Sequence, residues 1–235
     1  MPTIQIASSR LAVDFPPFIA RIVLRNPPLN VIDIPMMEEL SQSLAEVESR
    51  PDVSVIVFSS DGKAFSAGVD VAAHTPDKVE EMLTKFHAVI RAVVATKKVT
   101  IAAVHGHSLG GGAELAMVCD IVCTTESAQW GFPEIKLGCY PPVACTALAA
   151  LVGQKRAAEL ILTGRTITGK EAAEIGLANP PCSTMNCLSR WTNVSDTCAS
   201  SARWRWRWLR KRPTLGTRCT LIKVWLAPSG STLTN

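Results

Sequence analysis

Three consecutive glycines are followed two residues later by a glutamate in the segment Gly110-Gly-Gly-Ala-Glu114, and a second glutamate follows in Phe132-Pro-Glu134. Glycine has no Cβ, so a ligand oxygen can approach its backbone N–H closely. A carboxylate can give or take a proton. Backbone donors combined with two carboxylates are what chemistry at a polarised carbonyl requires. Taken singly, the glycines also fit close packing, and either glutamate fits an ordinary structural carboxylate.

The elements that must position these residues can be predicted from their apolar residues, which recur with a period of two in strands and of 3.6 in helices. Short β-rich runs cover residues 20–24, 53–59 and 100–104, and a further strand is predicted over 119–124. Helical spacing covers residues 35–47 and 77–94, and a helix that begins in glycine is predicted over 110–118. This alternation predicts an α/β domain with crossover connections.

In this arrangement, the triple glycine opens a helix just after a strand. The first N–H groups of a helix have no intrahelical acceptor, and they lie at the positive end of its dipole. A second donor is available in the segment Ala64-Phe-Ser-Ala-Gly-Val-Asp70. If the N–H groups of Val69 and Gly111 converge, they form an oxyanion hole for an ester or thioester oxygen, whose loss typically costs ~10²–10³ in rate.

A competing motif overlaps the same residues. The run Gly106-His-Ser-Leu-Gly110 matches the G-x-S-x-G nucleophile elbow of α/β-hydrolases, which would make Ser108 a nucleophile. Such enzymes carry their histidine base after the serine. All four histidines of this chain precede Ser108, so the sequence disfavours a serine hydrolase.

Composition divides the chain near residue 180. The last 56 residues hold nine basic residues, one acidic residue and five of the six tryptophans, so that part carries +8 and the rest −4. The first ten residues lack the pattern of a signal peptide, and no apolar stretch approaches the ~20 residues that span a bilayer. We therefore expect a cytoplasmic protein without a membrane segment. The eight cysteines show neither zinc spacing nor a disulfide framework, and the first four are expected to be core residues.

Residues 26–179 resemble the enoyl-CoA hydratase/isomerase, or crotonase, superfamily. The matching motifs stand in family order: Asn26-Pro-Pro-Leu-Asn30, Ala64-Phe-Ser-Ala-Gly-Val-Asp70, Ala102-Ala-Val-His-Gly106, Leu109-Gly-Gly-Gly-Ala-Glu114, Cys119-Asp120, Phe132-Pro-Glu-Ile-Lys-Leu-Gly138, and Leu162-Thr-Gly164 through Ala172 to Gly176-Leu177. The resemblance implies a crotonase-like spiral of repeated ββα units and an acyl-CoA thioester substrate. It implies no cofactor, since CoA is part of the substrate, no metal, and a homotrimer or dimer of trimers.

By the same resemblance, the oxyanion hole comes from the backbone N–H groups of Val69 and Gly111, and the catalytic pair is Glu114 and Glu134. Hydration needs a base for water and an acid for the α-carbon. The resemblance implies that Glu114 activates water and that Glu134 transfers the proton. The motifs also carry the residues that we expect to contact the substrate and its CoA moiety: Asn26, Pro28, Ala64, Ser66, Ala67, Asp70, Gly110, Tyr140 and Pro142.

A narrower resemblance concerns the acyl group. Residues 66–83 and 136–144 look like cyclohexa-1,5-diene-1-carbonyl-CoA hydratases of anaerobic benzoyl-CoA degradation. Common enoyl-CoA hydratases are Gly-rich where this chain has Pro141-Pro-Val-Ala144, and a stiffer wall suits a flat ring. The alternative within the family is a hydratase or isomerase of linear 2-enoyl-CoA.

After residue 179, the family pattern ends. We predict a catalytic core over residues 1–179 and a divergent, poorly ordered tail over 180–235. Alternating Arg-Trp in residues 203–208 can be written as repeated CGC-TGG codons, which encode Ala-Gly or Leu-Ala in the other frames, so a frameshift near codon 180 is one hypothesis. Another is an inactive core with a basic tail that binds nucleic acid or a membrane. Without an amphipathic face in the tail, neither partner is expected.

Overall fold

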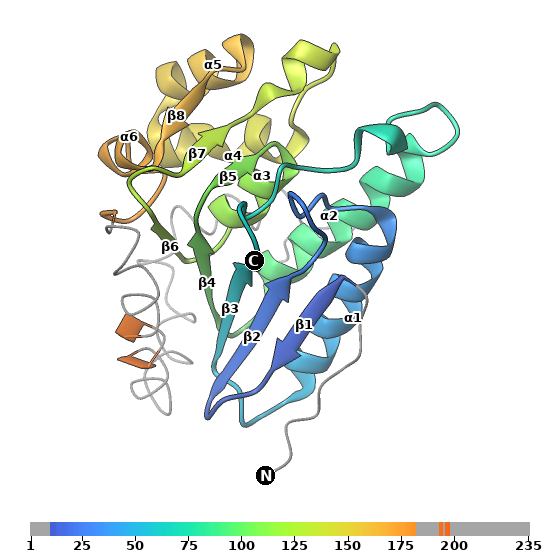
Figure 1. The fold of residues 1–235 in the computed structure, drawn as a ribbon, viewed down its shortest axis with the longest axis vertical. Coiled ribbons are helices and arrows are strands. Elements are labelled where there is room, and N and C mark those ends of the chain that lie inside the picture. The colour runs from blue at the N-terminus through green and yellow to red at the C-terminus, as the bar shows by residue number, and fades with distance from the viewer. Residues whose placement is uncertain (1–9, 182–192, 195, 198–235) are drawn as a thin grey trace, which may run out of the picture.

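Two β-sheets and the helices around them make up the structure, a computed structural model that describes residues 10–181, 193–194 and 196–197 (Figure 1). The larger sheet has the strand order β1-β2-β3-β4-β6, in which β1 is antiparallel to β2 and the other neighbours are parallel. Its strands are β1 (Leu11–Asp14), β2 (Ile19–Leu24), β3 (Val55–Ser60), β4 (Val99–Val104) and β6 (Ile121–Thr124).

The central strands of this sheet are apolar because both faces are covered. All six residues of β4 and the first four of β3 are buried. One face packs on α1 (Ile34–Ser49) and α2 (Val79–Ala95), which also pack on each other behind the sheet (Figure 1). A second apolar cluster lies on the opposite face, and partly buried Val194 packs against it. Buried strands of this kind are typical of parallel sheets with crossover helices.

Local signals explain where the two long helices begin. The side chain of Asp33 accepts a hydrogen bond from the N–H of Met36 at 2.9 Å, which caps α1, and Pro35 occupies its first turn. The helix α2 starts at Val79 with two glutamates in its first turn and buries Phe86 and Val89 among its apolar face. The cap and the 3.6-residue period account for α1, and the 3.6-residue apolar period accounts for α2.

The smaller sheet lies above the larger one in Figure 1 and carries the helices that surround the glycine segment. Its strand order is β5-β7-β8, with β5 parallel and β8 antiparallel to β7. These elements are β5 (His107–Leu109), α3 (Gly111–Met117), β7 (Gln129–Gly131), α4 (Pro142–Val152), α5 (Gln154–Thr163), β8 (Thr166–Thr168) and α6 (Gly169–Glu174). Two 3₁₀ helices are η1 (Val71–Ala73) and η2 (Pro133–Leu137).

The α/β prediction is confirmed, with differences in detail. A three-residue strand, β5, separates β4 from the glycine helix, so Gly110 is the N-cap of α3 rather than its first residue. The prediction that the first four cysteines are core residues is wrong in part. Cys119 and Cys123 are buried, but Cys139 is half-buried and Cys145 is exposed, because its position on α4 turns towards solvent.

The predicted tail falls mostly outside the described residues, including the Arg/Trp run of residues 203–212. Within the described ranges, no helix is long and apolar enough to cross a membrane.

Candidate active site

Two backbone N–H groups lie close together where the loop after β3 passes the start of α3. A Cβ built on Gly68 would lie 3.7 Å from the Gly111 nitrogen, and one built on Gly111 would lie 2.6 Å from Cγ2 of Val69. Backbone hydrogen bonds to Ile32 hold the residues on either side of Val69. The Ile32 N–H donates to the Gly68 carbonyl at 2.9 Å, and the Asp70 N–H donates to the Ile32 carbonyl. Among the described residues, no acceptor takes the N–H of Val69 or of Gly111. Both donors are therefore available to a ligand oxygen.

The glycines are required by these close approaches. Gly110 has a φ of +49°, and a Cβ there would lie 2.6 Å from Oε1 of Glu134. A Cβ on Gly112 would lie 2.7 Å from the backbone oxygen of Ser66. A real Cβ does not tolerate such distances, so each glycine lets a neighbouring segment come near.

Glu114 lies in the first turn of α3 and is 2% exposed. Its Oε1 accepts hydrogen bonds from the N–H groups of Val143 at 2.8 Å and Ala144 at 2.9 Å. These donors open α4, where Pro142 takes the first helical position. The N-terminal end of α4 therefore holds one carboxylate oxygen of Glu114 in place.

Burial controls the titration of Glu114. Burial raises the pKa of this carboxyl to about 8. The hydrogen bond from the Ala144 N–H acts in the opposite direction, and the nearby charge of Glu134 adds to the rise. Burial thus favours the protonated form of this carboxyl.

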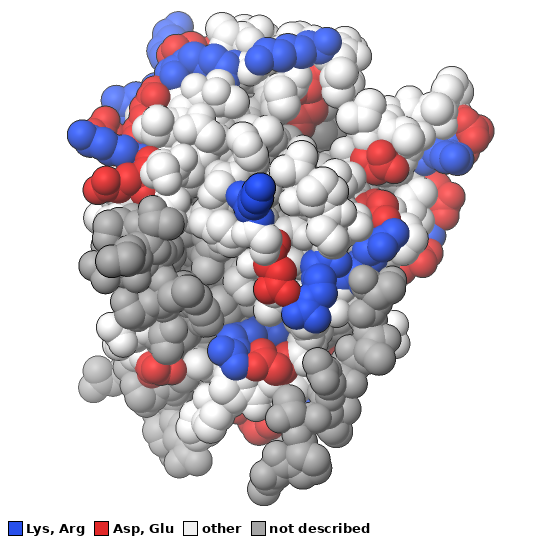
Figure 2. Space-filling model, viewed as in Figure 1, with Lys and Arg blue, Asp and Glu red and all other residues white. Residues whose placement is uncertain are grey.

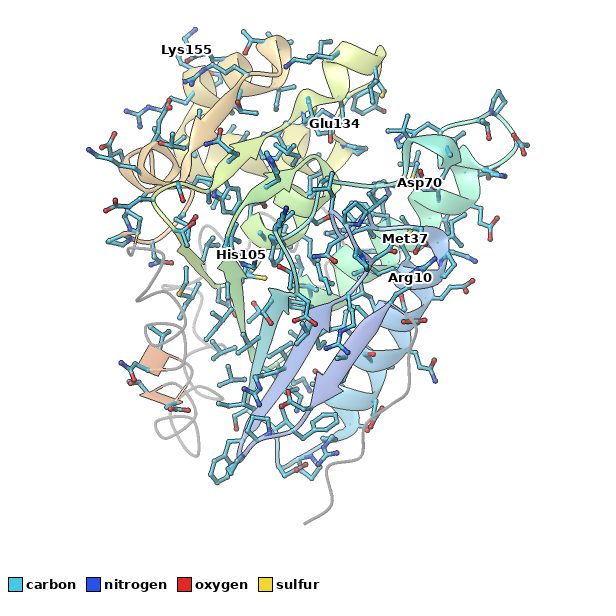
Figure 3. All side chains as sticks on the ribbon, in the orientation of Figure 1. Arg10, Met37, Asp70, His105, Glu134 and Lys155 are labelled. Atoms are coloured by element: carbon cyan, nitrogen blue, oxygen red, sulfur yellow. The ribbon has the colours of Figure 1, made fainter. Side chains whose placement is uncertain are left out.

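Glu134 reaches the same place from η2. Its Oε1 faces the backbone of Gly110, and its Oε2 is buried with no hydrogen-bond partner in the structure. Burial raises the pKa of this carboxyl too, while its own N–H and the charge of His74 lower it. Figure 3 labels Glu134 in the upper half of the view, and Figure 2 shows acidic atoms set back in a hollow of that region. Glu134 and the N–H groups of Val69 and Gly111 thus meet at the start of α3, the helix that also carries Glu114 in its first turn.

The remaining predicted residues fall on three segments around these groups. Asn26 and Pro28 precede α1, and the Asn26 amide donates to the Val31 carbonyl at 2.8 Å. Ala64, Ser66, Ala67 and Asp70 follow β3, where Ser66 Oγ accepts the Gly68 N–H and Asp70 caps η1. Tyr140 and Pro142 precede and begin α4, and the Tyr140 side chain is 67% exposed.

Sequence reasoning missed a positioning residue, Asn30. Its side chain is 1% exposed and donates to the carbonyls of Asp61 and Ala64, both at 2.8 Å, while its own oxygen accepts the Asn26 N–H. Asn30 thus joins the loop that precedes α1 to the loop that follows β3, which carries the N–H of Val69. Its place at the end of Asn26-Pro-Pro-Leu-Asn30 was the available signal. Phe86 was missed as well, and its ring lies 3.1 Å from a Cβ built on Gly111.

The serine of the hydrolase alternative is not placed for nucleophilic attack. Ser108 is 0% exposed on β5, and its Oγ has no hydrogen-bond partner in the structure. Among the described residues, the imidazoles of His74 and His105 bond to backbone carbonyls instead.

Comparisons with known proteins decide the family. The sequence model of the family described as Enoyl-CoA hydratase/isomerase matches residues 15–225. The chain belongs to the enoyl-CoA hydratase/isomerase family. A probable enoyl-CoA hydratase of Bacillus subtilis is 39% identical over 174 residues, which cover 72% of this chain and 67% of that protein.

Two further relatives bear on the site and the fold of this family member. The cyclohexa-1,5-dienecarbonyl-CoA hydratase of Thauera aromatica is 34% identical over 157 residues, 67% of this chain and 61% of that protein. The solved structure of Pseudomonas aeruginosa DspI superposes with a TM-score of 0.84 at 27% identity, covering 93% of this chain and 91% of that one. The predicted crotonase fold is therefore confirmed.

Proposed function

We propose that this protein is a hydro-lyase that adds water across a conjugated double bond of an acyl-CoA thioester. The observation that carries the proposal is the meeting, around the start of α3, of two N–H groups that have no acceptor among the described residues with the buried carboxyl of Glu114 and the partly buried carboxyl of Glu134. Family membership supports the CoA thioester, and several relatives are named as enoyl-CoA hydratases. The same relatives support a reaction without a separate cofactor.

The geometry fits the needs of hydration. The thioester oxygen would accept hydrogen bonds from the N–H groups of Val69 and Gly111, which stabilise the negative charge that develops on it. One carboxylate takes a proton from water as the oxygen bonds to the β-carbon, and the other carboxylic acid gives a proton to the α-carbon. The pair suits this because its two carboxyls disfavour simultaneous ionisation, so that one proton is retained.

For the acyl group, we propose a cyclic dienoyl-CoA. The Thauera enzyme carries that substrate in its name, and Pro141 and Pro142 stiffen the start of α4 next to Glu114. A linear 2-enoyl-CoA is the second candidate, favoured by the higher identity to the Bacillus subtilis relative.

An assay with both substrates tests the function. The chain should hydrate cyclohexa-1,5-diene-1-carbonyl-CoA faster than crotonyl-CoA, and Glu134→Gln and Glu114→Gln should each lower kcat by ~10²-fold or more. Turnover of crotonyl-CoA alone would establish the linear substrate. Unchanged turnover in either variant would contradict the two-carboxylate mechanism.

We also propose a homotrimer or a dimer of trimers. In the part of the chain that the structure describes, apolar side chains of η2, of the segment before α4 and of α5 are exposed: Ile135, Leu137, Tyr140 and Leu162. Such side chains could be covered by a second subunit. Sedimentation equilibrium measures the assembly, and a monomer at all concentrations would contradict it.

A further inference from the structure

The segment of residues 26–32, between β2 and α1, runs beside the loop that carries the Val69 donor. In Figure 1, both follow the carboxyl ends of β2 and β3, which are parallel neighbours in the larger sheet. The Ala67 N–H donates to the Leu29 carbonyl at 2.9 Å, and two further backbone bonds link Ile32 to the residues that flank Val69. The place of the Val69 N–H therefore depends on the shape of this segment.

The side chain of Asn30 fixes that shape. The residue is 1% exposed, and its Oδ1 accepts the Asn26 N–H at 2.8 Å. Its Nδ2 donates to the carbonyl oxygens of Asp61 and Ala64, both at 2.8 Å, in the loop after β3. A carboxamide has two N–H groups and one oxygen, so both ends of this side chain are bonded. One buried carboxamide thus holds the segment together and ties it to the first half of the Val69 loop.

The backbone of Asn30 restricts which residues fit at this position. Its φ is +52°, in the left-handed region that Asn, Asp and Gly tolerate better than other residues. Of these three, only Asn carries N–H groups that can donate to the two carbonyls. The position therefore requires both the backbone conformation and the carboxamide.

The Val69 loop has a second support on the side of the glycine helix. The Leu109 N–H donates to the Ser66 carbonyl at 3.0 Å, which holds the loop against β5 just before Gly111. The Val69 N–H thus lies between two supports, one from β5 and one from the Asn30 segment. Losing either support would change the separation of the two oxyanion donors.

We propose that Asn30 is a positioning residue for the reaction, whose carboxamide holds the Val69 N–H at the distance from the Gly111 N–H that a thioester oxygen needs. The inference rests on the proposed function for the identity of that oxygen. Asn30 is buried and acts through the loop. Without its carboxamide, the loop keeps its bond to β5 and loses its tie to residues 26–32, so one of the two donors is displaced.

Two substitutions separate the carboxamide from the backbone conformation. Asn30→Gly accepts the φ of +52° and removes every side-chain bond. Asn30→Asp keeps an acceptor for the Asn26 N–H and replaces the donor to both carbonyls with an oxygen. The matched control is Thr100→Val, because Thr100 is also 1% exposed and its hydroxyl makes two hydrogen bonds with Asp120 near the start of β4.

Butyryl-CoA labelled with ¹³C at the thioester carbonyl reports the polarisation directly. It has no double bond to hydrate, and its carbonyl NMR signal moves downfield when the oxygen accepts strong hydrogen bonds. The native chain and Thr100→Val should give the same downfield shift, and both Asn30 variants about half of it, since one of two donors is displaced. With an enoyl-CoA, kcat of the Asn30 variants should fall by about 10-fold or more, with a smaller change in KM. An equal carbonyl shift in the native chain and the Asn30 variants overturns the proposal.

Amide hydrogen exchange tests the tie between the two segments without a ligand. The N–H groups of Ala67, Ile32 and Asp70 close the bonds between them. They should exchange about 10-fold faster in both Asn30 variants and at the native rate in Thr100→Val. Unchanged exchange overturns the proposal, whatever the turnover. A native chain that neither shifts the butyryl-CoA signal nor hydrates an enoyl-CoA contradicts the proposed function, and the exchange rates then decide whether Asn30 holds the loop. The Tm of each variant verifies that it folds.

Discussion

At the scale of single residues, the site combines two opposed demands on Glu114. Burial favours its neutral form, whereas the N–H groups of Val143 and Ala144 favour its ionised form. Burial prevails, so the protonated form of this carboxyl is favoured at pH values where an ordinary glutamate is ionised. A group held this way can give its proton to carbon and can accept one again with little change in free energy, which is what an acid–base residue requires.

This protonation makes folding stability depend on pH. The folded Glu114 pKa of about 8 lies above the ordinary value of 4.5, so its contribution is complete below pH 4.5 and is lost as pH rises towards 8. At about 1.4 kcal/mol for each pKa unit, the loss amounts to a few kcal/mol at most. Glu114→Gln cannot ionise, so it should gain stability over the native chain between pH 5 and 8.5.

Urea unfolding at a series of pH values measures this difference. The control is Glu126→Gln, which changes an exposed carboxylate and should track the native chain. Parallel pH curves for the native chain and Glu114→Gln would show that Glu114 is not protonated by burial.

The close approach at Gly110 gives a second prediction at this scale. Gly110→Ala places a methyl group 2.6 Å from Oε1 of Glu134 and should displace that carboxyl, lowering kcat by about 10²-fold. Gly62→Ala is the matched control, because Gly62 has a φ of +89° and nothing within 4 Å. Both variants should lose about 1–2 kcal/mol of stability to backbone strain, but only Gly110→Ala should lose activity. Equal activity in the two variants would refute the contact.

At the scale of elements, sequence periodicity was sufficient for the long segments and insufficient for the short ones. The strand predicted over residues 100–104 is β4, Val99–Val104, and the helix predicted over 77–94 is α2, Val79–Ala95. By contrast, β5 has three residues, too few to show a period of two. The predicted donors and glutamates come together, but the N–H groups that hold Glu114 are backbone groups of α4, which side-chain motifs cannot reveal.

The start of α4 can be tested as an element. Val143→Pro removes one N–H that bonds Glu114 while leaving a proline in the first turn of the helix, where proline is tolerated. A hydrogen bond to a charged group is worth about 1.5–3 kcal/mol, so the pKa of Glu114 should rise further, by ~1 pH unit. Val143→Ala keeps the N–H and is the control.

A ¹³C NMR titration of the glutamate side-chain carboxyls measures the pKa of Glu114, and circular dichroism verifies that the helices form. If Val143→Pro folds and its Glu114 carboxyl titrates as in Val143→Ala, the N–H groups at the start of α4 do not lower the pKa of this carboxyl.

At the scale of the whole molecule, the larger sheet needs cover on two faces. Helices α1 and α2 cover one face. The other face presents apolar side chains from four strands, among them Val57 and Ile101, both 0% exposed. Val194 packs on this cluster from beyond the predicted boundary at residue 180, so at least this residue of the basic segment contributes to the core.

The predicted division into a core and a separate tail is therefore open to a direct measurement. Val194→Asp puts a charge against the apolar face and should cost about 1–2 kcal/mol of unfolding free energy. Val71→Asp is the control, because Val71 is 59% exposed. A chain that stops after Pro181 lacks the same contact and should lose at least as much stability, with a larger exposed apolar surface that binds ANS. If that shortened chain and Val194→Asp both unfold at the same urea concentration as the native chain, residues after Pro181 add nothing to the core, and a tail that is separate from the fold is the correct description.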